Sequence, residues 1–254
     1  MRLSRRDFLS LAAGGAATGA LFRTSFAEAA TGSKIKALAF DAFPIFDPRP
    51  VFALAEQLFP GKGAELSNIW RIRQFEYQWL RALSGRYVDF WQATDDALVF
   101  SANLLKLELP EEKRNRLMDA YLRLRAWPDV APALRLLKAT GIRLAILSNA
   151  TPKILDSGIL NSGLDGLFEH VLSTDSLRTY KPEARAYQMA VDAFGLNREE
   201  IGFVAFAGWD VAGAKWFGYP TFWVNRLNVP IEELGALPEA TGASLTELLP
   251  LLQA

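Results

Sequence analysis

Short apolar runs that alternate with helical stretches are the feature that most constrains the fold of this chain. Runs rich in Val, Ile, Leu and Phe fit short β-strands at residues 35–40, 144–147, 201–206 and 221–224, with a shorter candidate at 170–172. Buried strands separated by helical stretches are typical of a mostly parallel sheet covered by helices on its faces. The sequence therefore predicts an α/β fold.

A long segment, residues 48–125, interrupts this alternation after the first strand. It contains no convincing strand, and it is too long for a simple crossover connection. Its stretch "ELSNIWRIRQFEYQWLRAL" places Leu66, Ile69 and Trp70 near one another on a helix. We interpret the segment as an inserted helical cap, which leaves residues 30–47 and 126–254 to form the core.

The N-terminus resembles a twin-arginine export signal. The stretch "SRRDFL" contains Arg5 and Arg6, an apolar run rich in Ala and Gly follows it, and Ala27-Glu28-Ala29 has the small-x-small form of a cleavage site. The apolar run is too short and too rich in glycine for a spanning helix. We expect residues 1–29 to be a signal peptide, and the mature protein to work in the periplasm without stable membrane association.

The composition excludes several classes of function. The full chain has 28 basic and 28 acidic residues, and removal of residues 1–29 leaves 24 basic and 26 acidic residues. This balance argues against nucleic acid or an anionic membrane as a partner. The chain has no cysteine, which excludes thiol nucleophiles, zinc–thiolate sites, iron–sulfur clusters and disulfides.

Polar residues follow three of the predicted strands. Asp41 ends the apolar run in "LAFDAFPIFDP", Ser148 and Asn149 follow the second strand, and Asp210 lies just past the run at 201–206. Lys181 lies at a predicted helix start. A buried ionised carboxylate is costly unless it is paired, and ligands of open parallel sheets bind beyond the carboxyl ends of the strands. These residues therefore form a candidate active site.

The ordered set of Asp, Ser, Lys and Asp resembles the haloacid dehalogenase superfamily. The stretches "WRIRQFEYQWLRALSGRYVDFWQATDDAL", "LAILSNATP", "YKPEARAY" and "WDVAGAKWFGYPTFWVNR" resemble its type II branch, the (S)-2-haloacid dehalogenases. The similarity spans roughly residues 34–228. It implies a Rossmann-like core with a helical cap. It also implies hydrolysis of short (S)-2-haloalkanoic acids to (R)-2-hydroxy acids through an aspartyl ester, with no metal and no cofactor.

The resemblance assigns roles to individual residues. Asp41 matches the nucleophile that forms the ester, Lys181 the lysine that holds the carboxylates in place, and Asp210 the acid that helps activate water. Arg71, in the predicted cap, matches the arginine that receives the departing halide. Ser148, in the predicted core, matches the serine that binds the substrate carboxylate. The remaining substrate or halide ligands that match are an asparagine near the halide and a tyrosine six residues after the lysine, namely Asn149 and Tyr187.

Two departures from the family pattern affect the second half of this reaction. The family usually has Tyr-Gly-Thr-Leu-Phe-Asp after its nucleophile, whereas residues 43–47 are one residue shorter and lack the threonine. The family commonly has Ser-Ser-Asn-x before the Trp-Asp pair, whereas residues 205–208 are Ala-Phe-Ala-Gly. These positions orient the hydrolytic water. We therefore expect ester formation to be retained and ester hydrolysis to be slowed.

Several alternatives stay open at the level of the sequence. Phosphatases of the superfamily need a general acid two residues after the nucleophile, where this chain has Phe43; halide leaves without protonation. An exported protein that keeps the fold, has weak or lost catalysis and acts as a binding protein is a second interpretation. A hydrolase that opens strained 2-carboxylate rings is a third. The apolar faces of the cap helices also fit a homodimer interface.

Overall fold

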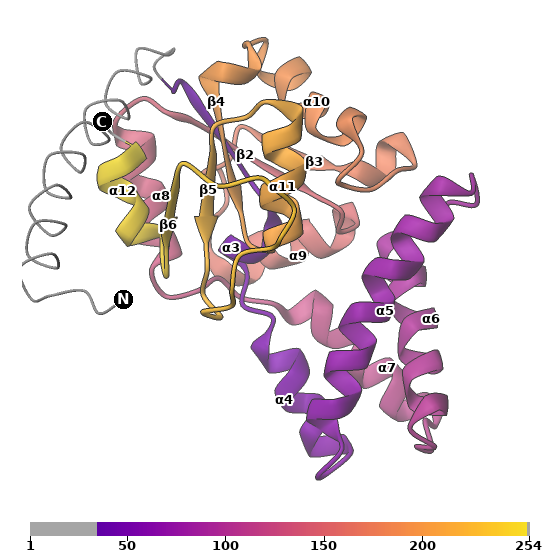
Figure 1. The fold of residues 1–254 in the computed structure, drawn as a ribbon. Coiled ribbons are helices and arrows are strands. Elements are labelled where there is room, and N and C mark those ends of the chain that lie inside the picture. The colour runs from indigo at the N-terminus through magenta and orange to yellow at the C-terminus, as the bar shows by residue number, and fades with distance from the viewer. Residues whose placement is uncertain (1–34, 253–254) are drawn as a thin grey trace, which may run out of the picture. The chain divides into compact units, whose positions relative to one another are not determined.

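The computed structural model describes residues 35–252, so the predicted signal peptide lies outside the described residues. Within that range six strands form one parallel sheet in the order β3-β2-β1-β4-β5-β6 (Figure 1). The strands are β1 (Ala37–Phe40), β2 (Arg143–Ser148), β3 (His170–Ser173), β4 (Ile201–Ala205), β5 (Thr221–Val224) and β6 (Ala240–Gly242). The predicted α/β fold with a mostly parallel sheet is confirmed.

The edge strand β6 was not predicted. It contains only Ala240, Thr241 and Gly242, so it lacks the apolar run that marks a buried strand. Its pairing with β5 comes from backbone hydrogen bonds rather than from side-chain burial. A pattern based on hydrophobicity cannot detect a strand of this kind.

The central strand β1 has both of its faces buried. Leu38 and Phe40 belong to a core that includes side chains of α8 (Val130–Ala139), α9 (Pro152–Ser162) and α12 (Leu245–Leu252). The alternate residues Ala37 and Ala39 belong to a second core, with α10 (Ala184–Phe194) and α11 (Gly208–Phe217). This alternation follows from the two-residue period of a strand. Figure 1 shows α8 and α12 on one side of the sheet and α10 and α11 on the other.

The order of the sheet reverses at β1, because β2 and β3 lie on one side of it and β4, β5 and β6 on the other. Phe40 pairs with Ile146 of β2 and with Val204 of β4, so the carboxyl ends of these three strands lie within two residues of one another in register. Such a reversal opens a crevice at the carboxyl edge of the sheet. The polar residues that follow the three strands therefore lie next to this crevice.

The helix predicted from Pro182 begins two residues later, at Ala184. The backbone N–H of Lys181 donates to Asn149 Oδ1 (2.8 Å), and the N–H of Glu183 donates to the carbonyl of Tyr180 (3.0 Å). These bonds fold the residues before α10 into a turn instead of a first helical turn. The turn directs Lys181 toward the ends of the strands.

The segment 48–125 contains helices and, among its described residues, no strand of the sheet. The helices are α4 (Arg49–Leu58), α5 (Gly63–Leu83), α6 (Phe90–Leu104), α7 (Glu111–Ala120) and the short η1 (Tyr121–Arg123). Helix α5 packs against both α4 and α6. The two chain connections between the segment 48–125 and the rest of the protein run side by side, because Phe46 and Ala126 form an antiparallel bridge. We refer to α4 to α7 as the cap and to the rest as the core. No helix among residues 35–252 is long and apolar enough to cross a membrane.

Candidate active site

The ammonium group of Lys181 is the centre of the candidate site. Its Nζ donates to Asp41 Oδ1 (2.8 Å), to Asp210 Oδ2 (2.6 Å) and to the carbonyl oxygen of Leu147 (3.2 Å). A lysine ammonium has three N–H donors, so each donor has one acceptor. Lys181 is fully buried. The buried carboxylate of Asp41, unexplained by the sequence alone, is therefore paired with a buried cation.

The strand ends place both carboxylates beside this lysine. Asp41 directly follows β1 and caps the short helix α3 (Ala42–Ile45), and its Oδ2 accepts a hydrogen bond from the N–H of Phe43 (3.2 Å). Asp210 is the third residue of α11, which follows β4. Since β1 and β4 are neighbours in the sheet, the two acids approach Lys181 from adjacent strands.

Two negative charges and one positive charge leave this buried cluster with a net charge of about −1 when all three groups are ionised. Burial raises the pKa of Asp210 to about 6, and the negative charge of Asp41 adds to this effect, while Lys181 opposes it. Burial alone would lower the pKa of Lys181, but Asp210 and Asp41 together raise it above its usual value. Lys181 is therefore charged at neutral pH, and Asp210 takes up a proton more readily than an ordinary aspartate does.

Tyr187 lies behind Asp210. Its hydroxyl donates to Asp210 Oδ1 (2.7 Å), and burial together with the Asp210 charge raises the pKa of this phenol well above its usual value. A Cβ at Gly213 would lie 2.3 Å from the Tyr187 hydroxyl oxygen, so only glycine in α11 leaves room for this contact. Tyr187 was predicted as a substrate or halide ligand, whereas the structure places it in the second core, where it contacts the acid and not the pocket.

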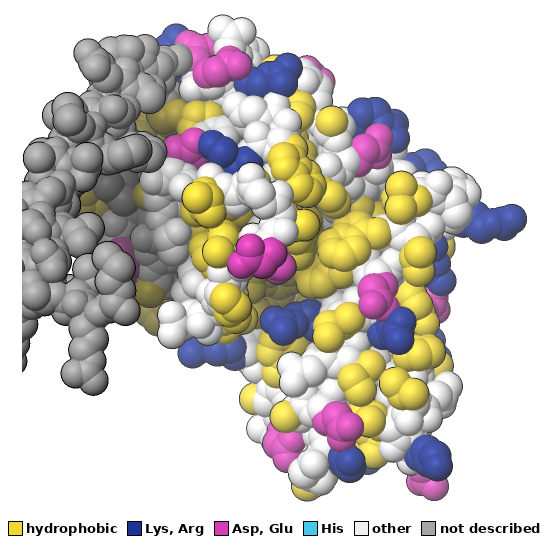
Figure 2. All heavy atoms as spheres, in the orientation of Figure 1, with side chains coloured by type: hydrophobic (Ala, Val, Ile, Leu, Met, Phe, Trp, Pro, Cys, Tyr) yellow, Lys and Arg dark blue, Asp and Glu magenta, His cyan; other side chains and the backbone are white. Residues whose placement is uncertain are grey.

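A pocket of about 680 Å³ lies between the carboxyl ends of the strands and the cap. Figure 2 shows hydrophobic side chains around a hollow between these two parts of the molecule. Four of the predicted site residues line the pocket, and they are Asp41, Arg71, Ser148 and Asn149. The three others lie behind its wall and are almost completely buried, and they are Lys181, Tyr187 and Asp210.

The side-chain amide of Asn149 has a fixed orientation. Its Oδ1 accepts from the backbone N–H of Lys181 (2.8 Å) and from Thr174 Oγ1 (3.3 Å), and its Nδ2 donates to Gln78 Oε1 (3.2 Å). An amide nitrogen has two N–H donors, so the second donor is available to a ligand. The neighbouring Ser148 Oγ accepts from the N–H of Ala150 (3.1 Å), which leaves the serine O–H to donate.

Two residues of α5 that sequence reasoning did not assign to the site connect the cap to the core. Gln78 is fully buried and bonds Asn149, and the indole N–H of Trp79 donates to the carbonyl of Lys181 (3.0 Å). The ring of Trp79 also packs edge-on against Trp209, with 5.4 Å between the ring centroids. One signal was present in the sequence: Gln74 and Gln78 are uncharged polar residues four positions apart, so they lie on the same face of the predicted helix.

The residues that depart from the family pattern also border the site. Ala205 ends β4, and Ala207 is the N-cap residue of α11, where it gives no side-chain hydrogen bond to the helix. Phe206, between them, lines the pocket and lies 6.0 Å from Phe43, measured between ring centroids. The wall beside Asp41 is therefore apolar where the family pattern has polar side chains.

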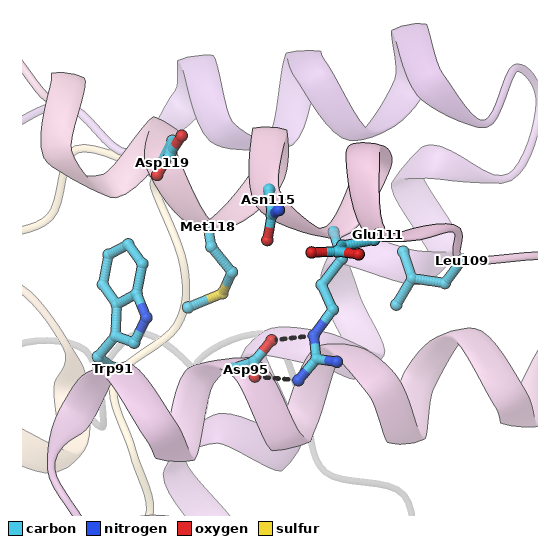
Figure 3. Close-up of a pocket in the computed structure, with 8 residues that line it drawn as sticks. Trp91, Asp95, Leu109, Glu111, Asn115, Met118 and Asp119 are labelled. Atoms are coloured by element: carbon cyan, nitrogen blue, oxygen red, sulfur yellow. Dashed lines mark hydrogen bonds and ion pairs between the residues drawn. The ribbon is translucent and has the colours of Figure 1, made fainter.

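No group of three or more His, Cys, Asp or Glu side chains in the described part of the chain is arranged to hold a metal ion. A second pocket, of about 360 Å³, lies within the cap between α6 and α7 (Figure 3). There Arg114 Nε donates to Asp95 Oδ1 (2.6 Å). None of the predicted site residues lines this second pocket.

Comparison with known proteins identifies the family. The family model for haloacid dehalogenase-like hydrolases matches residues 17–218. Haloacetate dehalogenase H-2 of Moraxella sp. (strain B) is 46% identical over 209 residues, which cover 82% of this chain and 93% of that protein. An (S)-2-haloacid dehalogenase of Pseudomonas sp. (strain YL) is 44% identical over 220 residues, which cover 86% of this chain and 95% of that protein.

Solved structures agree with this result. The crystal structure of an L-2-haloacid dehalogenase superposes with a TM-score of 0.85 at 44% identity and covers 87% of this chain and 100% of that one. The L-2-haloacid dehalogenase from Xanthobacter autotrophicus, with chloropropionic acid covalently bound, superposes with a TM-score of 0.78 at 34% identity and covers 87% of this chain and 99% of that one. This chain belongs to the haloacid dehalogenase-like hydrolase family.

Proposed function

We propose that this protein hydrolyses the carbon–halogen bond of (S)-2-haloalkanoic acids and releases (R)-2-hydroxy acids. The observation that carries the proposal is Asp41: its carboxylate lines the pocket and is held by Lys181, while Ser148, Asn149 and Arg71 line the same pocket. Relatives with this activity cover most of this chain. A related enzyme with chloropropionic acid covalently bound supports a covalent intermediate.

In the first step a carboxylate oxygen of Asp41 attacks C2 of the substrate from the side opposite the halogen. The carbon–oxygen bond forms as the carbon–halogen bond breaks, and the halide leaves with the bonding electron pair. Arg71 and the free N–H of Asn149 stabilise the departing anion. Ser148 donates its hydroxyl to the substrate carboxylate. Halide is a very weak base, so the apolar Phe43 beside the nucleophile is compatible with this step.

In the second step a water oxygen attacks the Asp41 carboxyl carbon, and the bond between that carbon and the oxygen of the 2-hydroxy acid breaks. One proton of the water ends on the departing oxygen, the other is taken up by the base and passes to solvent, and Asp41 is regenerated as a carboxylate. Asp210 is the base for this water, and Lys181 stabilises the negative charge on the former carboxylate oxygen. Both oxygens of Asp210 already accept hydrogen bonds, from Lys181 and Tyr187, and the side chain is buried. The methyl groups of Ala205 and Ala207 cannot hold the water. We therefore propose that ester hydrolysis limits turnover.

Rapid mixing of the protein with (S)-2-chloropropionate tests both steps. We expect a burst of about one halide per active site followed by slow turnover, with the adduct mass located on Asp41. Asp41→Asn should abolish the burst, and Asp210→Asn should keep the burst and stop the slow phase. Linear halide release without an adduct would show that ester hydrolysis is not slow. Absence of both halide and adduct would favour a binding protein that has lost catalysis.

We also propose that the protein is exported by the twin-arginine route and loses residues 1–29. The support comes from Arg5-Arg6 and the Ala27-Glu28-Ala29 site in the sequence. Cell fractionation with N-terminal sequencing tests this: the expected result is a periplasmic chain that begins near Ala30. A cytoplasmic chain that retains residues 1–29 would contradict it.

We propose further that the protein forms a homodimer through the cap. Leu80 and Leu83, near the end of α5, are 62% and 87% exposed. Large apolar side chains grouped on a surface are typical of protein interfaces, and the family resemblance points the same way. Light scattering on the wild type and on Leu83→Glu tests the proposal: the wild type should have the mass of two chains and the variant that of one. A monomeric wild type would refute it.

A further inference from the structure

The pocket is much larger than a short 2-haloacid requires. A chloropropionate ion has six non-hydrogen atoms, and if each occupies about the 30 Å³ that a water molecule takes up in the liquid, the ion fills about 180 Å³. The pocket measures about 680 Å³. Most of its volume therefore stays available after the reacting centre is bound.

Two aromatic side chains of the core, Phe43 and Phe206, line the pocket beside Asp41. Phe43 follows Asp41 by two residues, and Phe206 follows β4, the neighbouring strand; their ring centroids lie 6.0 Å apart. Phe206 occupies a position where the family commonly has a serine. This substitution extends apolar surface away from the nucleophile.

The cap and the connection after β5 continue the apolar surface to the rim of the pocket. Ile72 of α5 lines the pocket and is 54% exposed, and Leu227 and Val229 line it from the other side with 40% and 46% exposure. Isolated exposed apolar side chains are ordinary, but a continuous apolar surface that leads into a pocket is typical of a ligand site. The lining also contains polar side chains, among them Asn68, Asn225 and Glu232. We call the apolar part of the lining, from Phe206 beside Asp41 to the exposed Ile72, the apolar channel.

The geometry at C2 indicates what occupies this channel. Three groups other than hydrogen surround the reacting carbon: the carboxylate, the halogen and the alkyl chain. Ser148 and Asn149, with Arg71, supply the polar contacts for the first two. The alkyl chain is therefore the group that meets the apolar wall.

We propose that the apolar channel binds a long alkyl chain, and that the preferred substrates are 2-haloacids whose alkyl chain is longer than the methyl group of 2-halopropionate. This inference rests on the proposed dehalogenation and adds the substrate class to it. Each methylene that enters the channel leaves water, so binding should strengthen about threefold to fourfold per methylene until the chain reaches the rim.

Calorimetric titration of the protein with unhalogenated n-alkanoates, from propanoate to octanoate, tests the channel without any turnover. We expect the dissociation constant to fall about threefold to fourfold per added methylene. Displacement of the acids by (S)-2-bromopropionate in Asp41→Asn, which cannot form the ester, would show that the acids occupy the reactive pocket. Equal affinities along the series, or a loss of affinity with chain length, would overturn the proposal.

Two matched variants locate the chain. Ile72→Gln places a polar group in the channel, and Leu104→Gln makes the same change on α6 at a side chain of nearly equal exposure (55%) that does not line the pocket. In Ile72→Gln the dissociation constants of the longer acids should be nearly equal. In Leu104→Gln they should fall with each added methylene as they do in the wild type. If they fall in the same way in Ile72→Gln, the chain does not lie in the channel.

The same series made with (S)-2-bromo acids separates the two proposals. Bromide release from 2-bromopropionate tests dehalogenation itself. If bromide is released and the alkanoate series is flat, the channel is wrong and the proposed function stands. If the alkanoate series has the expected slope and no acid releases bromide, the ligand class stands and the proposed function fails.

Discussion

On the core side of the pocket the charged groups are buried and hydrogen-bonded, whereas on the cap side the charged group is exposed and has no such bonds within residues 35–252. On the core side, Lys181 and Asp210 are almost fully buried, and every N–H of the ammonium group has an acceptor within 3.2 Å. On the cap side, Arg71 is exposed and lines the pocket, and its side chain forms no hydrogen bond or ion pair with any described residue. The carboxylate that we propose as the nucleophile is therefore held by hydrogen bonds, whereas the guanidinium that we propose as the halide ligand is placed only by the packing of the cap on the core.

Lys181→Met should have the largest effect on stability and on the halide burst, because it removes the cation from the core side of the pocket. Two carboxylates would then be buried without a partner, and breaking a buried ion pair typically costs about 3–5 kcal/mol of stability. The burst of halide should be lost as well. Urea unfolding and rapid mixing measure the two effects.

The pH dependence of this loss gives a further check. In the wild type Lys181 opposes the rise that burial causes in the pKa of Asp210, so without the cation this pKa should lie further above its value in the unfolded chain. The folded variant then binds more protons than the unfolded chain, so its stability should fall as pH rises. The loss should be largest near about pH 7 and smaller near about pH 5. Equal stability of variant and wild type at neutral pH would contradict the pairing that we describe.

Arg71→Ala alters the cap side, and there we expect a large loss of rate with little loss of stability. Removal of a charge-assisted donor from a developing anion typically costs about 10²-fold in rate, whereas an exposed side chain without partners contributes little to folding. Arg73→Ala is a suitable control, since Arg73 is paired with Glu76 on the same helix and does not line the pocket. Equal burst rates for the two variants would exclude Arg71 as the halide ligand.

The ratio of burst rates for bromide and chloride substrates sharpens this test. Chloride is the poorer leaving group, so it depends more on stabilisation by the protein. We therefore expect Arg71→Ala to slow the chloride substrate more than the bromide substrate.

Sequence reasoning reached the core side more completely than the cap side, for a physical reason. Asp41, Ser148 and Asp210 follow strands, and the carboxyl ends of parallel strands must meet at one edge of a sheet. The bonds from Gln78 to Asn149 and from Trp79 to Lys181 join residues that are 71 and 102 positions apart in the chain. Local periodicity does not determine contacts of that kind, because they depend on how the cap packs on the core.

The role of Tyr187 shows the same limit at the level of a single side chain. The family motif predicted its position in the chain but not the direction in which its hydroxyl points. That direction depends on the gap at Gly213 and on the packing of α10 against α11. The position of the residue could be predicted, and its contact with Asp210 could be found only from the packed structure.

Ala207→Asn should stabilise the protein and speed ester hydrolysis, because it restores a polar side chain near the position of the hydrolytic water. Ala207 has extended backbone angles (φ −89°, ψ 142°) and is the N-cap of α11, a position that asparagine favours. We expect about 1 kcal/mol of added stability from the cap and a slow phase that becomes about 10-fold faster, with the burst unchanged. If stability rises but the slow phase does not change, the missing amide is not what limits ester hydrolysis.

Gln78→Leu should weaken the contact between the cap and the core, because it removes the hydrogen bond to Asn149. Loss of the bond to Asn149 Nδ2 frees that amide to turn away from the halide, and a neutral hydrogen bond contributes about 1 kcal/mol. We expect a burst that is about fivefold slower, and a larger effect for chloride than for bromide. Gln92→Leu, at an exposed residue of α6, should leave both rates unchanged. A loss of stability without any change in the chloride-to-bromide ratio would assign Gln78 a structural role only.

Tyr187→Phe should change only the slow phase, through its pH dependence, and leave the burst unchanged. Burial raises the pKa of Asp210 to about 6, and the hydrogen bond from Tyr187 is one of the contacts that oppose this rise. Asp210 must be ionised to accept a proton from water, so the slow phase should accelerate as pH rises through about 6 in the wild type. A hydrogen bond to a charged group is worth about 1.5–3 kcal/mol, so its loss should move this midpoint upward by about one to two pH units.

Tyr219→Phe is the control, because the Tyr219 hydroxyl donates to the carbonyl of Tyr187 and not to Asp210. The burst should show neither shift, since Asp41 attacks without help from Asp210. A midpoint that stays near 6 in Tyr187→Phe, or moves downward, would mean that a group other than Asp210 activates the water.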